Sequence, residues 1–291
     1  MELESGHLYA FGAGLSFAIS DVMTRVATRG YRSELLVLLS LSIGTPYLWL
    51  SAIVAGESIP DLRDALLFIG LGPLHFGLGR LLFYKAIAGL GASSAAITTS
   101  PTIIISSFLA WMILDEELTL MDATGALMVA TAVFIAGYSP TGVSLQGVSP
   151  TIGFASGLGA SFVFSISSII VRYAGSSSQA PIMGSALSYT AALPVALLMS
   201  KGRVDSLHRS NTRLLAVALV SGVVVSTAQL LRYTALSMVP IVEALIFISL
   251  FPLHTLAIAS LVGSHGGERI RAIHGPAAVL AVLGIIVTLL Y

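Results

Sequence analysis

The sequence predicts an all-α integral membrane protein in which ten transmembrane helices form two inverted five-helix repeats around a central cavity. Three observations predict this fold: charge is scarce, apolar runs recur at one length, and the two halves resemble each other. Only 10 % of the 291 residues are charged, against roughly 25 % in ordinary soluble domains. Hydrophobic residues make up 56 %, and the mean hydropathy is +0.94. In water such a chain would expose large apolar patches, which excludes a cytosolic globular enzyme and a disordered chain.

Charge balance and cysteine content exclude further classes of protein. Fourteen basic and fourteen acidic residues give a net charge of zero, so the chain has no basic field that would attract nucleic acid. There are no cysteines, which excludes disulfides, thiolate metal sites and thiol catalysis. The first seven residues are acidic rather than basic, and no small-x-small cleavage site follows, so we expect the first apolar run to be a retained span.

Apolar runs recur at the length of a membrane span, which is about 20 residues. Residues 35–56 and 86–114 are free of charge, and the longer run 123–171 is divided by turn residues at 138–142 and 147–150. Continuous apolar runs favour helices over the alternating pattern of a membrane barrel. The ten expected spans are 8–28, 35–55, 65–88, 92–114, 121–138, 151–173, 180–200, 213–236, 239–263 and 272–291.

The two halves of the chain share marks at a nearly constant offset. Tyr84 and Tyr233 lie 149 positions apart, as do Ser100 and Ser249, and each serine is close to a proline inside a span. The first span carries Gly12, Gly14, Ser16, Phe17 and Ser20, and the sixth carries Gly157, Gly159, Ser161, Phe162 and Ser165. We therefore expect two repeats, 1–145 and 146–291. Because five spans is an odd number, the second repeat enters the bilayer from the opposite side, an architecture characteristic of secondary transporters.

Several of these marks also form a family pattern. Tyr84-x-Ala86, Ser100-Pro101, Asp115-Glu116-Glu117-Leu118-Thr119, Gly125-Ala126-Leu127 and Gly137 resemble the EamA domain of the drug/metabolite transporter superfamily. Tyr233-x-Ala235-Leu236, Glu268 and Gly275 resemble a more divergent second copy. The resemblance implies ten spans, an inverted repeat, a central cavity and alternating access, and it specifies a substrate hardly at all.

Polar residues within the expected spans are the candidates for function, because a charge near the bilayer centre costs at least ~2.5–3.5 kcal/mol. Arg80 is deep in the third span, and Tyr84 follows on the same helix face. The Arg80 guanidinium could bind a substrate carboxylate or phosphate, or it could make a structural ion pair or hydrogen bond. The expected substrate-binding or cavity residues are Ser16, Ser20, Arg80, Tyr84, Ser100, Tyr233 and Ser249.

Three further residues are candidates for coupling or gating: Asp21, Arg232 and Glu243. Asp21 is the best-placed acid for proton coupling, although Arg25 one turn later could neutralise it. Arg232 and Glu243 reach similar depth across a tight turn and are expected to pair with each other, or to act as gate residues.

Other polar residues have simpler interpretations. Lys85 and Arg172 are close enough to helix ends to extend to the headgroups. His75 and His254 have no second ligand at metal spacing, so we expect neither a metal nor another cofactor.

The leading functional prediction is a secondary-active exporter of amino acids or related organic solutes. Coupling of this export to protons is one alternative. Multidrug or nucleotide-sugar and organic-phosphate carriers of the same fold are alternatives, as is a non-transporting receptor or scaffold. No Walker motif is present, and no clustered catalytic constellation indicates an enzyme. The expected partners are a small-molecule substrate and the lipid bilayer, without nucleic acid or an ATPase domain in this chain. The protein is expected as a monomer or homodimer in a prokaryotic inner membrane.

Orientation in the membrane is predicted differently by two arguments. Lys and Arg gather in the loops after odd-numbered spans, which places both termini outside the cytoplasm. The family resemblance implies both termini inside it, and we expect that orientation.

Overall fold

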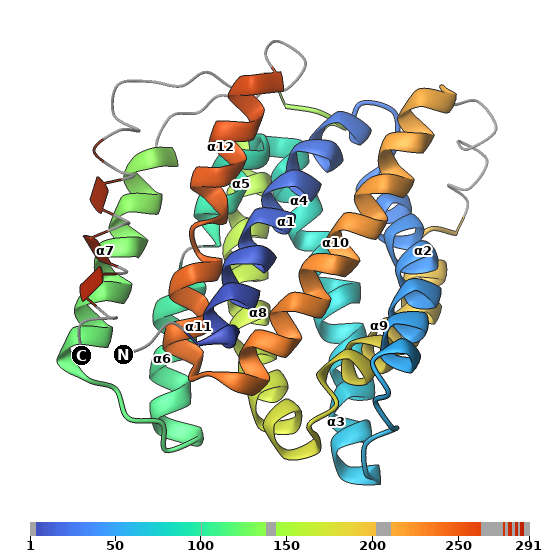
Figure 1. Ribbon diagram of the computed structural model, residues 1–291. Helices are drawn as coiled ribbons and strands as arrows, with labels where there is room; N and C mark the ends of the chain where they lie inside the picture. The colour runs from blue at the N-terminus through green and yellow to red at the C-terminus, as the bar shows by residue number, and fades with distance from the viewer. Residues whose placement is uncertain are drawn as a thin grey trace.

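In the computed structural model the protein is a bundle of membrane-length helices (Figure 1). The structure describes residues 4–99, 101–137, 144–201 and 211–262, together with 276, 279–280, 283–284 and 286–287. Within these residues the regular elements are all helical, as the composition predicts. The helices are α1 (Ser5–Ala27), α2 (Ser33–Val54), α3 (Leu62–Gly72), η1 (Pro73–Gly79), α4 (Arg80–Leu90), α5 (Ala92–Thr98), α6 (Pro101–Ile113), α7 (Leu120–Gly137), α8 (Pro150–Ser178), α9 (Pro181–Met199), α10 (Thr212–Met238), α11 (Ile241–Ile248) and α12 (Phe251–Val262).

The first nine expected spans each correspond to one helix or to a consecutive set of helices. The third span is α3, η1 and α4 in succession, the fourth is α5 and α6, and the ninth is α11 and α12. Seven segments in the described part of the chain are long and apolar enough to cross a membrane. The tenth expected span, 272–291, lies largely outside the described residues, so the count of ten stays a prediction.

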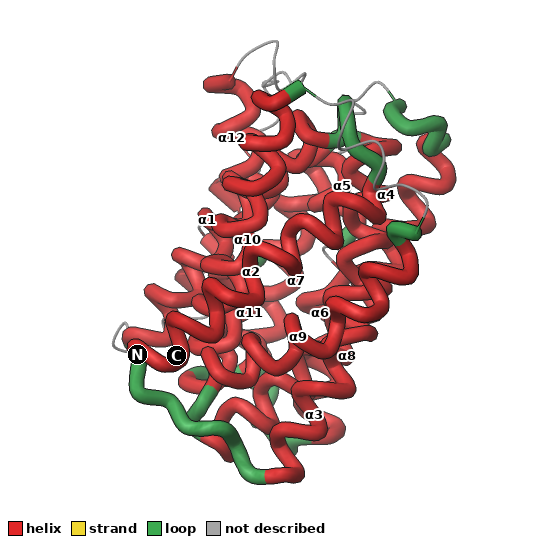
Figure 2. Tube along the Cα trace, turned by 90° about the vertical axis from the view of Figure 1, so that its right-hand side faces the viewer, coloured by secondary structure: helices red, strands yellow, loops and turns green. Residues whose placement is uncertain are grey.

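Helices from the two halves pack against one another rather than forming separate bundles. Contacts join α1 to α10, α2 to α9 and α4 to α8, and the interleaving is visible from the side in Figure 2. Small residues permit this close approach. A Cβ at Gly72 would overlap the backbone oxygen of Ser188, so α3 and α9 touch backbone to backbone.

Two spans are broken near their middle, each of them beside a proline. Helix α5 ends at Thr98 and α6 begins at Pro101, while α11 ends at Ile248 and α12 begins at Phe251. Proline cannot donate its backbone nitrogen, which makes it suited to the first turn of a new helix. By contrast, Pro194 lies inside the continuous helix α9, so a break there is not observed.

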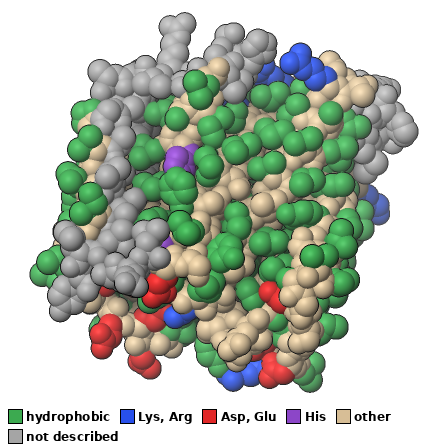
Figure 3. All heavy atoms as spheres, in the orientation of Figure 1, with side chains coloured by type: hydrophobic (Ala, Val, Ile, Leu, Met, Phe, Trp, Pro, Cys, Tyr) green, Lys and Arg blue, Asp and Glu red, His purple; other side chains and the backbone are tan. Residues whose placement is uncertain are grey.

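Charged side chains gather at the two ends of the bundle, and apolar side chains cover its flank (Figure 3). The basic end carries Arg29, Arg32, Lys85, Lys201 and Arg213, with Glu34 among them. The acidic end carries Glu4, Glu57, Asp61, Asp64, Asp115, Glu116, Glu117, Asp122 and Glu243, with Arg63 and Arg172. An apolar flank between two charged ends is what a bilayer requires of a protein that spans it.

Candidate functional site

A cavity lies between helices of both halves and encloses about 900 Å³ of space, part of it open to the outside. Both helix breaks reach it, because Thr99 and Ser249 are among the lining residues. The polar lining residues are Asp21, His75, Arg80, Tyr84, Thr99, Thr102, Ser168, Gln229, Arg232 and Ser249. Aromatic and aliphatic side chains form the rest of the wall, including Phe17, Phe83, Phe164 and Phe251. Such a mixture of an apolar wall and a few convergent polar groups is typical of small-molecule sites.

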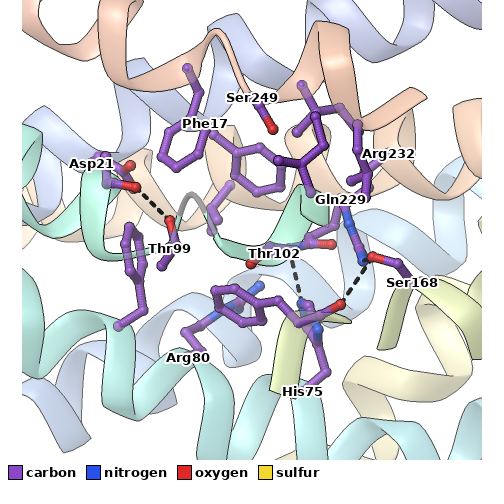
Figure 4. Close-up of a pocket in the computed structure, with 18 of the residues that line it drawn as sticks. Phe17, Asp21, His75, Arg80, Thr99, Thr102, Ser168, Gln229, Arg232 and Ser249 are labelled. Carbon is purple, nitrogen blue, oxygen red and sulfur yellow. Dashed lines mark hydrogen bonds between the residues drawn. The ribbon is translucent and has the colours of Figure 1, made fainter. Parts of the chain in front are cut away.

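One side of the cavity is built around Arg232. Its Nη2 donates to Ser168 Oγ at 2.9 Å and lies 3.5 Å from Ser167 Oγ, both on α8. Gln229, one turn earlier on α10, lies 3.4 Å from His75 through the two Nε2 atoms. In Figure 4 these side chains lie on the side of the cavity away from Asp21 and Thr99. Polar side chains from both halves therefore line the cavity, and His75 of the first half lies beside Gln229 of the second.

Arg80 also lines the cavity but is held in place from several directions. Its guanidinium donates to Tyr189 Oη at 2.6 Å and to Ser40 Oγ at 3.2 Å. It also lies over the rings of Phe76 and Tyr189, at 4.7 and 4.8 Å from their centroids. Cation–π contacts and charge-assisted hydrogen bonds of this kind fix a guanidinium in one position. Arg80 thus combines a site on the cavity wall with a structural contact between α2, α4 and α9.

Five of the ten residues singled out from the sequence line the cavity. They are Asp21, Arg80, Tyr84, Arg232 and Ser249. Ser20 instead bonds Ser221 at 3.2 Å between α1 and α10, and the Tyr233 hydroxyl donates to Ser188 at 3.3 Å. Ser16 is half-buried on α1 outside the lining, and Ser100 lies outside the described residues.

The expected pairing of Arg232 with Glu243 is wrong. Glu243 Oε2 lies 2.8 Å from His7 Nε2 and joins α11 to α1, whereas Arg232 bonds the serines of α8. Depth along a helix was the basis of the expectation, but depth does not fix the direction around the helix axis.

Arg172 does not extend to the headgroups. Its Nε donates to Glu116 Oε1 at 2.7 Å, and its Nη1 donates to the carbonyls of Leu236 and Ser237 at 3.2 and 3.3 Å. Glu116 Oε2 in turn accepts from the backbone nitrogen of Ile241 at 2.9 Å. These bonds join α8, α10, α11 and the segment before α7 at the acidic end.

Sequence reasoning missed His75, Thr99, Thr102, Ser168 and Gln229 as lining residues. Gln229 had a usable signal, because it follows Arg80 by the same 149 positions that separate Tyr84 from Tyr233. His75 had no such signal, because a single histidine in an apolar run does not indicate which residues lie next to it in the fold. Among the described residues no group of three His, Cys, Asp or Glu is arranged to hold a metal ion.

Comparison with known proteins identifies the fold family. Residues 4–138 match the model of the EamA-like transporter family. This half of the chain belongs to the EamA-like transporter family. The matched residues thus belong to a family of membrane transporters of the drug/metabolite type, and the membrane-length helices make the protein an integral membrane protein.

A solved structure is similar to the chain over its whole length. One of 29 matching chains, from a structure titled "Crystal structure of protein", covers 99 % of this chain and 99 % of its own, with a TM-score of 0.75. At 16 % identity it shows a common fold and nothing about cargo. No curated protein matches the sequence.

Proposed function

We propose that the protein is a secondary-active carrier that exports amino acids or related small organic solutes by alternating access. The observation that carries the proposal is a cavity lined from both halves, in which two guanidinium groups, one carboxylate and several uncharged polar groups lie among apolar and aromatic side chains. Such a site suits a small solute with both charged and apolar parts. Binding sites at the interface of two repeats, beside broken helices, are characteristic of secondary transporters.

An inverted repeat of the halves 1–145 and 146–291 is part of the proposal. Arg25 on α1 donates to the carbonyls of Ile87 and Ala88 at the end of α4, at 2.9 and 3.2 Å. Arg172, 147 positions later on α8, donates to the carbonyls of Leu236 and Ser237, each 149 positions after its counterpart. The start of α8 lies against the end of α4, through Gly153 and Gly89, so α8 runs from the Arg25 site towards the Arg172 site. This exchange of equivalent contacts at opposite ends supports a twofold relation.

Helix packing and a second pair of contacts support the same relation. α1 packs on α10 while α8 packs on α4, and α2 packs on α9. Tyr84 bonds Ser40, and Tyr233 bonds Ser188, with 148 or 149 positions between equivalent residues. In an inverted repeat, closing one end and opening the other exchanges the conformations of the two halves, which provides two access states from one set of contacts.

Charge in the cavity narrows the class of cargo. Among the described lining residues the formal charges are those of Arg80, Arg232 and Asp21. Two cations and one anion favour a cargo with a carboxylate or similar anion over an organic polycation. Nucleotide sugars and organic phosphates are the second candidate, because guanidinium groups also bind phosphate. We propose Asp21 as the residue that couples transport to protons, working in a monomer or homodimer in a prokaryotic inner membrane.

Counterflow into proteoliposomes tests the proposal. Purified protein is reconstituted with a panel of unlabelled amino acids, organic phosphates or cationic dyes inside, and uptake of the same labelled compound is measured. We expect saturable uptake for members of the amino-acid panel, dependence on an imposed pH gradient, and loss of that dependence in Asp21→Asn. Absence of saturable counterflow for every panel would contradict a carrier and favour a receptor or scaffold.

A further inference from the structure

Three buried polar atoms on the Arg232 side of the cavity have no hydrogen-bond partner among the described residues. They are Nη1 of Arg232, Oε1 of Gln229 and Nδ1 of His75. The three residues are 5 %, 4 % and 3 % exposed, and all three line the cavity. A buried polar group without a partner costs free energy, so three in one cluster need an explanation.

We propose that Arg232, Gln229 and His75 form a receptor for the carboxylate of the cargo, with Ser168 holding Arg232 in place. This inference rests on the proposed function and names the chemical group that the same cavity recognises. Cargo would then supply the partners that the described residues do not supply. The sequence pointed instead to Arg80, which is already bonded to Ser40 and Tyr189 and covered by two rings.

Hydrogen-bond counting explains why this cluster suits a carboxylate. If Gln229 Nε2 donates to His75 Nε2, then His75 Nδ1 carries the free hydrogen and Gln229 Oε1 is a free acceptor. If the amide is turned over, Gln229 supplies the free donor and His75 Nδ1 the free acceptor. In both arrangements the pair of Gln229 and His75 has one free donor, and Arg232 Nη1 is a second. Two donors are therefore free to bind an anion with two oxygens. One acceptor is left over for an N–H or O–H group of the same cargo.

The surroundings of the cluster favour an anion bound to an apolar body. Arg80 is near enough to His75 to act on it electrostatically, which adds a second positive charge. The ring of Phe164 packs 4.8 Å from that of His75, so the receptor borders the aromatic wall. Asp21 lines the same cavity beside Thr99, away from the cluster in the view of Figure 4. A carboxylate at Arg232, apart from the like-charged Asp21 and beside an apolar wall, describes a cargo with a carboxylate and an apolar side chain, such as an apolar α-amino acid.

A matched set of ligands tests the receptor without altering the protein. L-leucine, 4-methylpentanoate, L-leucinamide and 3-methylbutylamine share one apolar body, and only the first two have a carboxylate. The same set is built on phenylalanine. Binding to the purified full chain is measured by thermal stabilisation and by competition in counterflow. We expect the carboxylates to bind and the amides and amines to bind at least tenfold more weakly, the worth of a charge-assisted hydrogen bond.

Variants then locate the receptor. Arg232→Gln is expected to weaken carboxylate binding about tenfold to a hundredfold, with partial recovery in Arg232→Lys, while Arg213→Gln at the exposed start of α10 leaves it unchanged. The inference is overturned if carboxylates bind no better than their amides and amines, or if Arg232→Gln keeps full affinity in a folded protein. Flux that persists in either case leaves the carrier proposal intact. Conversely, carboxylate-dependent binding without flux supports the receptor and contradicts the carrier.

Discussion

Arg25 and Arg172 make the same contact at opposite ends of the bundle, each donating to two neighbouring carbonyls in the last turn of a helix that belongs to the same half. The last carbonyls of a helix lack the usual partner four residues further on. Ile87 O and Ala88 O also accept from the backbone nitrogens of Gly91 and Leu145, so Arg25 adds to the contacts that hold the end of α4. Arg172 is further held by Glu116 at 2.7 Å, which adds an ion pair at the acidic end. Both contacts are formed in this structure, and under the proposed alternating access the opening of either end would break one of them.

Opposite effects are expected from removing each arginine. The chain has no cysteine, so Val225→Cys on the cavity wall provides a single label for a membrane-impermeant maleimide. Arg172→Gln should speed labelling from the acidic end, and Arg25→Gln should speed it from the basic end. Loss of charge-assisted hydrogen bonds of about 1.5–3 kcal/mol each corresponds to a rate change of at least tenfold. Arg63→Gln and Arg213→Gln are the exposed controls, and equal effects from both ends would exclude a gating role.

Arg80 is expected to matter for stability as well as for flux. Arg80→Met removes hydrogen bonds to Ser40 and Tyr189 and a stack on two rings, with a loss of about 2–4 kcal/mol in unfolding free energy. Thermal melts in detergent measure this, with Arg213→Met as the surface control. If flux is lost while the melting temperature stays the same, Arg80 binds cargo as the sequence first indicated.

The separation of charge predicts the orientation in the membrane. Basic residues are kept on the cytoplasmic side during insertion, so the end with Arg29, Arg32 and Arg213 should face the cytoplasm. This reverses the orientation that the family resemblance implies. In intact cells an impermeant maleimide should label Ser58→Cys, at the acidic end, and should not label Thr212→Cys, at the basic end, until the cells are opened. The reverse pattern, or labelling of both sites, would contradict the prediction.

Two glycines of α3 should respond oppositely to alanine. A Cβ at Gly72 meets the backbone of Ser188, whereas a Cβ at Gly70 meets nothing within 4 Å. Gly72→Ala should therefore lose about 1–3 kcal/mol through overpacking, while Gly70→Ala should be neutral or gain up to about 1 kcal/mol from helix propensity. The difference between the two melting temperatures tests whether α3 and α9 are in contact.

Glu57, in the loop between α2 and α3, predicts a pH dependence. Burial raises the pKa of its carboxyl, although the carboxylate accepts from the backbone nitrogen of Met183 at 2.7 Å. The folded state thus holds the proton more tightly than the unfolded state, and this contribution to stability is lost as pH rises through the raised pKa. Glu57→Gln stays neutral, so it should melt higher than the wild type at pH 7 and match it at pH 4. Parallel melting curves across that range would show that burial of Glu57 has no such effect.

Much of the fold was predictable because lipid constrains a sequence strongly. Charges mark the ends of spans, and nine of the spans expected from them correspond to helices of the described chain. The prolines close to Thr99 and Ser249 indicate the two helix breaks, because proline acts on the backbone of its own turn and needs no distant partner. The π-helical turn η1 could not be predicted, because Pro73 alone does not distinguish it from a kink.

The site was less predictable, because it depends on which way side chains point across the bundle. Asp21, Arg80 and Arg232 stood out as charges in apolar runs, and each lines the cavity. The partners of Arg172 and Glu243 are backbone carbonyls and a histidine more than fifty positions away. No local pattern encodes such contacts, so their roles emerge only in three dimensions.

The π-helical turn η1 distinguishes the two halves at the place where they are otherwise most alike. Such turns arise where one residue is inserted into an α-helix. α10, the counterpart of α3 to α4 in the proposed repeat, runs from Thr212 to Met238 without one. The turn leads directly into Arg80, where the other half has Gln229. If the protein alternates between two access states as proposed, unequal halves give these states unequal free energies. The empty carrier would then rest mainly in one of them, and cargo or coupling ion would supply the difference.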